Sequence, residues 1–585
     1  VYVISPSSVG NPILDEDNRK FASAYFIIDI TNPEELPTLL GEITYTTDGE
    51  DLDNDAWLDV VNEDTIVVNG LLDVGEDQDG DGHLDDGTED VNGNGILDGE
   101  IELGYTMAIP TVVPMNDGTD TTWYLILGSG PTSHNPIVNA LKGTSDQNAR
   151  LAVIPLHDRM NPVSGLKSLR IPTALPAASG VNEEFGTIRV LNADGSPYKD
   201  SFISDLITVD LETFPDYKAD VVYFGTVTGD WTDGSGIEGW GGRLYRMVTR
   251  SDGSGAIFTG ASSQMVTKPS EWPTLLSGGT PSLLNPNIMY DAGKPIISAP
   301  TVGTDGIDFW VYFGTGRFFD AGDKRDSGSN AAQTFYGIRE PVLCSAGTFA
   351  GPNWLTVPNT SPEPEPPGYT VPVQRGGVGL LKVEDIAIQQ VAGAQEDTAG
   401  VVGCYNGGNF DPDIDLCFDG IPADHPLKTY GSFGDFLDYI TGADIYCYPG
   451  DSPGFDGWSR DMLHYKERNL GQATLLGGLI SYSSYIPDTN ICNQEGSGYL
   501  YGHYYQSGTA WYEDVFGRSP IINAPIDPGI YMGKGLSTTP NIHVGEQEGG
   551  KAFIQTSVGQ IVEIPQPNLP ITNIKTGRIK WYDIE

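Results

Sequence analysis

Short apolar segments separated by acidic or glycine-rich turns recur along the chain, and they predict β-strands. A typical copy opens with a proline, serine or threonine beside a short apolar segment and continues into an aromatic segment. The paired segments are 109–112 with 123–128, 206–209 with 221–225, 299–302 with 310–314, and 539–542 with 552–556. Further strands are expected at 242–246, 333–337 and 559–563. We expect each group to fold as an antiparallel meander.

Repeated meanders of this kind are typical of a β-propeller, whose sheets bury both faces against their neighbours and leave few free edges. The predicted fold is therefore all-β, with long insertions that explain the irregular spacing. Two segments, 507–511 and 576–581, approximate T/S-G-x-x-x-W and resemble the tryptophan-docking motif of quinoprotein-type propellers. One short helix is predicted at 382–392, and the proline-rich segment 359–373 is expected to form an extended connector.

We divide the chain into N-terminal propeller strands at 1–47, an acidic insertion at 48–102 and the remaining propeller at 103–585. The last part contains an insertion, rich in proline and with cysteines, at about 340–460. The chain begins at Val1 without a leader, as expected of a processed chain or a fragment. No apolar run reaches the roughly 20 residues that a membrane-spanning helix requires, so no membrane insertion is expected.

The charge balance excludes whole classes of partner. The chain has 31 Lys and Arg against 80 Asp and Glu, which gives a net charge of −49. Binding to nucleic acid or to anionic lipid needs clustered basic residues, so neither partner is expected. The 74 glycines and 41 prolines favour a loop-rich β protein over a helical bundle.

The acidic residues are concentrated in one tract. Residues 48–102 contain 20 carboxylates and no Lys or Arg. Carboxylates at this density repel one another, and few apolar residues are available for a core. We therefore expect the tract to need cations in order to fold.

The spacing of the acidic residues predicts calcium loops, because alternate residues of a tight turn can direct oxygen ligands at one point. Two copies have glycine at the sixth position, and a third copy lacks it. The side-chain ligands expected are Asp77, Asp79, Asp81 and Asp85; Asp90, Asn92, Asn94 and Asp98; and Asp51, Asp53, Asp55 and Asp59. The seventh positions, His83, Ile96 and Trp57, would contribute backbone carbonyls.

These loops differ from an EF-hand, because no Glu occupies the twelfth position and no helical periodicity flanks them. Glu89 and Glu100 lie close enough in sequence to complete the ligand shells. We expect two or more Ca²⁺ ions, as in the tandem aspartate-rich loops of extracellular proteins. The alternative is a solvated acidic linker.

Motifs occur in order at 26–33, 110–130, 311–317 with 333–337, 471–474 and 491–492. This ordered series resembles the C-terminal propeller of PilY/PilC-type proteins of type IV pilus tips. The resemblance implies a modified propeller of about seven blades, a secreted protein at the cell surface or pilus tip, and roles in pilus biogenesis and adhesion. It also implies minor pilins of the tip complex as partners, with a host or abiotic surface as a further partner.

The same resemblance implies a calcium loop before the strand at 221–225. At that place the chain keeps Asp210, Glu212 and Asp220, with Asp216 nearby, but the segment is longer than in the family and lacks the glycine.

The cysteines support neither a zinc ribbon nor a haem attachment site, because no C-x-x-C is present among the five. Cys404 and Cys417 are close enough in sequence to form a disulfide in a secreted protein. Reduced, buried thiols are the alternative.

Catalysis is not expected. Residues 450–454 match G-x-S-x-G, but the prolines and glycines around them predict a loop instead of a nucleophile elbow. The seven histidines form no H-E-x-x-H pair. A quinone-dependent dehydrogenase is the enzyme alternative on grounds of fold, and a generic binding or structural propeller of a surface filament assembly is the other alternative.

Overall fold

The structure is a computed structural model. It describes residues 2–7, 24–29, 38–44, 46–47, 57–58, 101–102, 104–116, 121–131, 142–145, 148–155, 171–172, 187–193, 195–196, 198–210, 219–229, 239–251, 265–266, 272, 284–304, 308–319, 321–325, 332–345, 348–352, 354, 374–375, 379–390, 400–406, 409–417, 426–428, 431–442, 454–488, 496–518, 524–544, 550–570 and 575–576.

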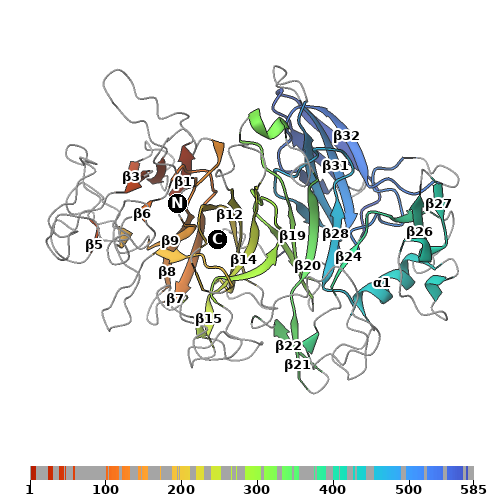
Figure 1. Cartoon of the computed structure of the whole chain (residues 1–585), viewed down its shortest axis with the longest axis horizontal. Coiled ribbons are helices and arrows are strands. Elements are labelled where there is room, and N and C mark those ends of the chain that lie inside the picture. Colours follow the sequence, from red (N-terminus) through yellow and green to blue (C-terminus); the bar gives the residue numbers. More distant parts are fainter. Residues whose placement is uncertain are drawn as a thin grey trace. The chain divides into compact units, whose positions relative to one another are not determined.

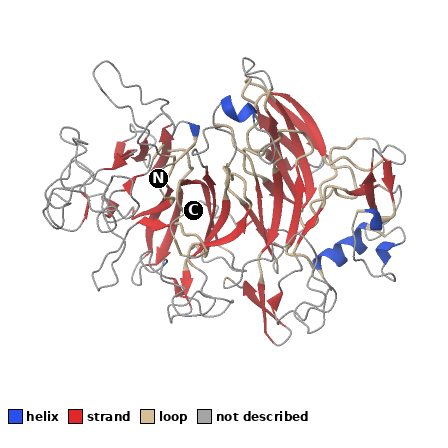
Figure 2. Ribbon diagram, in the orientation of Figure 1, coloured by secondary structure: helices blue, strands red, loops and turns tan. Residues whose placement is uncertain are grey.

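The chain divides into two compact units. The first comprises Val1–Asp210, Phe214–Ile257 and Gln264–Pro295, and the second comprises Leu211–Thr213, Phe258–Ser263 and Ile296–Glu585. Strands dominate both units, and one α-helix is present among the described residues (Figures 1 and 2). The all-β fold predicted from the sequence is confirmed at this level.

Among its described residues, the first unit contains three sheets of three or four strands. Their orders are β1-β2-β3, β11-β9-β8-β7 and β12-β13-β14-β17. The strands are β1 (Tyr2–Ser7), β2 (Ala24–Asp29), β3 (Thr38–Thr44), β7 (Thr111–Asn116), β8 (Thr121–Gly128), β9 (Arg150–Pro155), β11 (Thr187–Arg189), β12 (Ser201–Val209), β13 (Val221–Thr228), β14 (Arg243–Val248) and β17 (Asn287–Asp291). The meanders predicted around 109–128 and 206–246 are confirmed.

Short two-stranded pairs accompany these sheets. They are β4 (Thr46–Thr47) with β6 (Ile101–Glu102), β5 (Trp57–Leu58) with β10 (Ile171–Pro172), and β15 (Arg250–Ser251) with β16 (Met265–Val266).

The second unit contains a six-stranded sheet of order β24-β28-β20-β19-β18-β36, a four-stranded sheet β29-β30-β31-β32 and a three-stranded sheet β33-β34-β35. Their strands are β18 (Thr301–Thr304), β19 (Phe309–Gly314), β20 (Thr334–Arg339), β24 (Leu380–Lys382), β28 (Gly457–Asp461), β29 (Thr474–Leu476), β30 (Leu479–Ile486), β31 (Ser497–Tyr504), β32 (Gly529–Lys534), β33 (Asn541–Val544), β34 (Gly550–Gln555), β35 (Ile561–Gln566) and β36 (Lys575–Thr576). The meanders predicted around 299–337 and 539–563 are confirmed.

Two smaller sheets lie in the insertion between β20 and β28. They are β22-β21-β23, from Thr348–Pro352, Val342–Ser345 and Gln374–Arg375, and β25-β26-β27, from Ile386–Gln389, Val401–Asn406 and Asn409–Asp411. Short 3-10 turns at Ile414–Leu416 (η6) and Pro426–Lys428 (η7) follow the second sheet, and η3 (Ala321–Arg325) lies between β19 and β20.

The core explains why several strands lack a simple alternation of apolar and polar residues. Every residue of β19 and β20 is buried, and so are the first seven residues of β30. Strands covered on both faces need apolar or well-bonded side chains at successive positions. Trp310, Tyr312, Phe335, Trp458 and Tyr482 belong to the hydrophobic core of this unit.

The short helix predicted at 382–392 is wrong. This segment ends β24, turns at Glu384 and Asp385, and continues as β25. Its apolar residues at 386 and 388 alternate with the period of a strand, and β25 pairs with β26 while β24 pairs with β28.

The α-helix lies instead at Phe433–Thr441 (α1), where the sequence analysis expected none. Ser432 and Asp435 form a capping box at its start, and Phe433, Phe436 and Ile440 are its buried face. The capping signal and this spacing are both present in the sequence.

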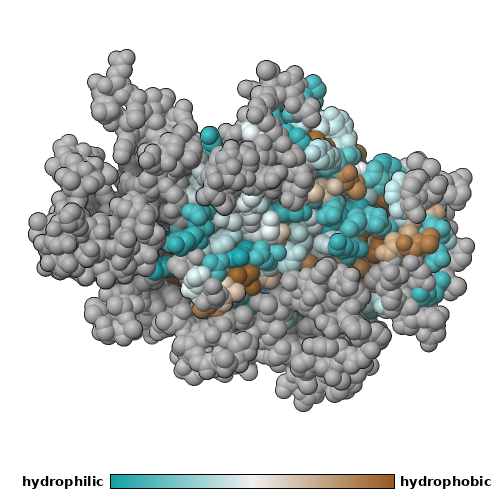
Figure 3. Space-filling model, in the orientation of Figure 1, coloured by the Kyte–Doolittle hydropathy of each residue, from teal (hydrophilic) through white to brown (hydrophobic). Residues whose placement is uncertain are grey.

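On the face shown in Figure 3, hydrophilic residues alternate with small apolar groups over the described surface. Within the ranges described, no helix combines the length and the apolar character needed to cross a bilayer.

Candidate functional site

The main calcium loops predicted from the sequence lie outside the described residues. These are the copies at 77–85 and 90–98 with Glu89 and Glu100, and most of the copy at 51–59. Only the backbone of Trp57 is described, and it pairs with Pro172 in the β5–β10 pair. Calcium binding by this tract stays a prediction.

The candidate calcium loop between β12 and β13 is described at its two ends. Asp210 directly follows β12, and Asp220 precedes β13, where its backbone N–H donates to the Val209 carbonyl at 2.9 Å. The Asp220 carboxylate lies 2.6 Å from Arg250 Nε, and both side chains are buried. Arg250 therefore already compensates the charge of Asp220.

Glu212 and Asp216 lie outside the described residues, so the ligand set expected here is not brought together. Within the described part of the chain, no three His, Cys, Asp or Glu side chains are placed to hold a metal ion.

A half-buried carboxyl group marks a bulge in β12. The pairing of β12 with β13 shifts register between Ile203 and Leu206, and Asp205 lies in this interval. Asp205 Oδ1 accepts the backbone N–H of Ile109 at 2.7 Å. Burial raises the pKa of Asp205 to about 6, although the hydrogen bond from Ile109 opposes this shift.

The second unit has a layer of stacked rings between its six-stranded and four-stranded sheets. The rings of Phe335 on β20 and Tyr482 on β30 are parallel, with centroids 3.7 Å apart. Along β31, Tyr499, Tyr501 and His503 lie on one face, with successive centroids 6.2 and 5.8 Å apart. These rings form a continuous aromatic contact between the two sheets.

Trp458 joins β28 to the loop after β31. Its indole Nε1 donates to the Tyr505 carbonyl at 2.9 Å. Gly508 has φ +66°, and a Cβ there would lie 2.3 Å from Cε3 of the Trp458 ring. Only glycine lets the ring approach so closely, so this contact docks a tryptophan against a glycine-containing turn.

This contact refines the docking motif predicted at 507–511. Gly508 of the motif receives a tryptophan, but the tryptophan is Trp458 and comes from another sheet. The motif's own Trp511 packs against Phe433 of α1, with centroids 5.3 Å apart. In the second predicted copy, residues 577–581 lie outside the described part.

Glu467 is a fully buried carboxylate beside this layer. Its Oε1 accepts the hydroxyl groups of Tyr501, at 2.7 Å, and of Ser484, and its Oε2 accepts the backbone N–H of His464 at 2.9 Å. A buried charge is tolerated when several donors satisfy it, and Glu467 has donors from β30, from β31 and from its own turn.

His503 is buried between Trp458 and Tyr501, and its Nε2 shares a hydrogen bond of 3.2 Å with the Tyr482 hydroxyl. Burial, and after it the charge of Arg460, hold the pKa of His503 well below its usual value. The imidazole is therefore neutral at physiological pH.

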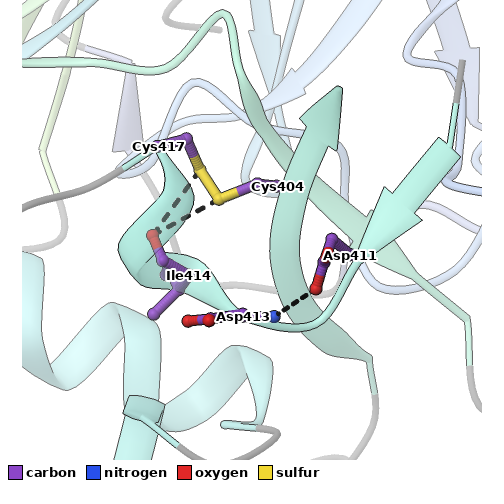
Figure 4. The surroundings of a disulfide bond; sticks show 5 residues. All are labelled: Cys404, Asp411, Asp413, Ile414 and Cys417. Atoms are coloured by element: carbon purple, nitrogen blue, oxygen red, sulfur yellow. Dashed lines mark hydrogen bonds between the residues drawn. A yellow bond between two sulfur atoms is a disulfide. The ribbon is translucent and has the colours of Figure 1, made fainter. Parts of the chain in front are cut away.

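The disulfide left open by the sequence is formed. Cys404 on β26 is bonded to Cys417, which follows η6 (Figure 4). The Ile414 carbonyl oxygen lies 3.3 Å from Cys404 Sγ, and the Ile414 side chain is buried. The bond therefore holds η6 against the β25–β27 sheet, with Ile414 in the core.

The G-x-S-x-G segment lies at 450–454, of which only Gly454 is described. Its role as a loop without catalytic function stays a prediction.

Sequence reasoning missed Glu467 and the ring face of β31. The signal for the ring face was present, because Tyr499, Tyr501 and His503 have the period of two that places side chains on one face of a strand. Glu467 carries no comparable signal, since a lone glutamate in a turn is normally exposed.

Comparisons with known proteins complete these findings. No family model and no curated protein matches the chain. Among solved structures, the chain is similar to the crystal structure of the Pseudomonas aeruginosa PilY1 C-terminal domain. The two are 14% identical with a TM-score of 0.42, and the similarity covers 97% of this chain and 84% of that chain. That domain is of the same family that the sequence motifs resemble.

Proposed function

We propose that this chain is the calcium-binding β-propeller of a type IV pilus tip protein, acting without catalysis in pilus biogenesis and adhesion. One observation carries the proposal: the family's motifs occur in order, and those that the structure describes fall on four different sheets, while 491–492 lies outside the described residues. The motif at 26–33 begins in β2, the motif at 110–130 spans β7 and β8, and those at 311–317 and 333–337 lie in β19 and β20. The motif at 471–474 leads into β29.

A propeller of about seven blades, with quinoprotein-like docking contacts, is the arrangement we propose for these sheets. Repeated meanders of three or four antiparallel strands support it, as does the docking of Trp458 against Gly508. The disulfide supports secretion to the cell surface, because such bonds persist mainly in oxidising compartments.

The partners we propose are the minor pilins of the pilus tip complex. The test is affinity purification of the tagged protein from its native cells, followed by identification of bound proteins. Enrichment of minor pilins is expected. Recovery with a different surface assembly would favour the generic binding propeller, and a quinone absorbance in the purified protein would favour the dehydrogenase.

The proposed calcium site is tested by limited proteolysis with and without a chelator. Removal of Ca²⁺ should restore repulsion among the carboxylates of 48–102 and expose this tract to cleavage, while the sheets stay resistant. Extracellular calcium sites bind at about 10⁻⁴–10⁻³ M, so millimolar Ca²⁺ should restore protection. Equal cleavage rates in the two conditions would contradict the proposal.

A variant assigns the effect to the predicted ligands. Asp79→Asn combined with Asp81→Asn removes two carboxylates from one loop, so a higher Ca²⁺ concentration should be needed for protection. The control is Glu563→Gln, which neutralises an exposed carboxylate on β35 and should leave the calcium dependence unaltered.

A further inference from the structure

The loop that follows β28 exposes large side chains that soluble proteins usually bury. Leu463 is 50% exposed and Tyr465 is 67% exposed. Between them, the ring of His464 lies 4.5 Å from the ring of Tyr499 on β31. Tyr499 in turn lies 5.3 Å from Tyr531 on β32, which is 55% exposed. We call these five side chains the aromatic platform.

Hydrogen bonds of Glu467 and Lys466 fix the loop that carries part of the platform. Buried Glu467 accepts the backbone N–H of His464 and the hydroxyl of Tyr501, so it ties the exposed loop to the sheet. Lys466 has φ +64°, which is uncommon for a residue with a side chain, and its Nζ donates to the Lys324 carbonyl at 2.5 Å. A buried charge and an unfavourable backbone angle thus maintain a turn that presents Leu463 and Tyr465 to solvent.

Polar groups border the rings. Asp461, the last residue of β28, is exposed, and its Oδ1 accepts the Thr334 hydroxyl at 2.7 Å. The side chain of Asp527 is 64% exposed, and its Oδ2 lies 3.8 Å from Arg518 Nη1. The Asp527 carboxylate lies just before β32, where its Oδ1 accepts the backbone N–H of Gly529 at 2.9 Å, two residues before Tyr531. The site therefore combines ring faces with carboxylate acceptors.

We propose that the aromatic platform binds a neutral saccharide. A pyranose has an apolar C–H face, which packs on the electron-rich face of an aromatic ring, and hydroxyl groups, which donate to carboxylates. A site made of a few fixed rings with acceptors at the edge matches both features. The inference rests on the adhesive part of the proposed function and names its ligand class.

Two other occupants fit the observations less well. An acidic glycan would be repelled by a chain of net charge −49. Lys466, whose Nζ lies 5.6 Å from the centroid of the Tyr465 ring, already donates to the Lys324 carbonyl. A stable protein partner needs an interface of about 800 Å² on each side. The apolar part of this surface is confined to a few side chains with exposed carboxylates beside them.

The experiment is saturation-transfer NMR on the whole chain with methyl glycosides of glucose, galactose, mannose and N-acetylglucosamine, and with lactose and sialyllactose. At least one neutral sugar should receive saturation, and sialyllactose should bind no better than lactose. Binding should persist in a chelator, because none of the predicted calcium ligands belongs to the platform.

Variants locate the site by titration of the best sugar. Tyr531→Ala and Tyr465→Ala should each weaken binding about tenfold, the effect of losing one stacked ring. Tyr531→Phe, which keeps the ring, should retain binding. Tyr405→Ala is the matched control, since Tyr405 on β26 is also exposed and lies outside the platform.

Three results would overturn the inference: no neutral sugar binds, the platform variants bind as the unsubstituted chain does, or a pilin competes for the platform while sugars do not. None of these results would affect the outcome of the calcium test or of the co-purification test. Failure of those tests would in turn leave sugar binding by the purified chain in place.

Discussion

The β29–β32 sheet and the β33–β35 sheet are consecutive antiparallel meanders of one unit, yet they are buried to different extents. In β30 the first seven residues are buried, whereas β33 has three exposed residues among its four. Strand β35 alternates, with Ile561 73% exposed and Ile564 buried. Strand formation therefore does not decide whether a residue contributes to the core; the neighbours on each face of the sheet decide it.

The difference extends to charged residues. Glu467 is fully buried beside the β29–β32 sheet with three donors, whereas Glu563 on β35 pairs with Lys551 at 2.9 Å at the surface. A glutamate can therefore contribute strongly to the stability of one sheet and little to the stability of the next.

The largest effect is expected from Trp458→Ala. Loss of this buried indole removes the contact with Gly508 and the hydrogen bond to Tyr505, and should cost about 3–5 kcal/mol. The control is Ile561→Ala on β35, for which we expect a change within about 0.5 kcal/mol. Hydrogen exchange of the backbone amides of β28 and β31 measures the stability of this region in each variant. Equal effects of the two substitutions would remove the distinction between the sheets.

A smaller effect is expected from Glu467→Gln. An amide offers one acceptor oxygen and no charge in place of two carboxylate oxygens, so some of the three donors lose their partner. The free energy of unfolding should fall by about 1.5–3 kcal/mol. The matched substitution Glu563→Gln removes a surface ion pair and should cost about 0–1 kcal/mol. Unfolding in urea compares the two. A larger loss for Glu563→Gln would contradict the comparison.

The smallest effect is pH-dependent and comes from His503. Because its pKa is lowered in the folded state, the folded protein keeps the imidazole neutral while the unfolded chain takes up a proton below about pH 6.5. Stability should therefore be fully present above that pH and fall on acidification, by at most about 1.4 kcal/mol per pH unit. His503→Phe should flatten this dependence. An unchanged slope between about pH 7 and pH 5 would show that other groups cause it.

Much of the secondary structure could be predicted from the sequence, because apolar runs bounded by glycine and proline are local signals. The strands expected at 109–128, 206–246, 299–337 and 539–563 are all present. The helix expected at 382–392 was wrong because a short apolar run suits either structure until its pairing partner is known. The capping box of α1 is also a local signal, and it marks where the helix does form.

The candidate sites were less predictable. The calcium loops rest on spacing alone and stay a prediction. The platform depends on residues at 463–465, 499 and 531 that are separate in sequence and lie together only because β31 pairs with β32 and the loop after β28 reaches Tyr499.

The sequence by itself determined the all-β character and most of the strand positions, because these follow from composition and local periodicity. Only the tertiary structure decided that Trp458 docks on Gly508, that Cys404 bonds to Cys417, and that Glu467 is buried. The contacts of Trp458 and Glu467 join segments that are separate in sequence, and the cysteine pairing, which the sequence left open, depends on the fold of residues 404–417.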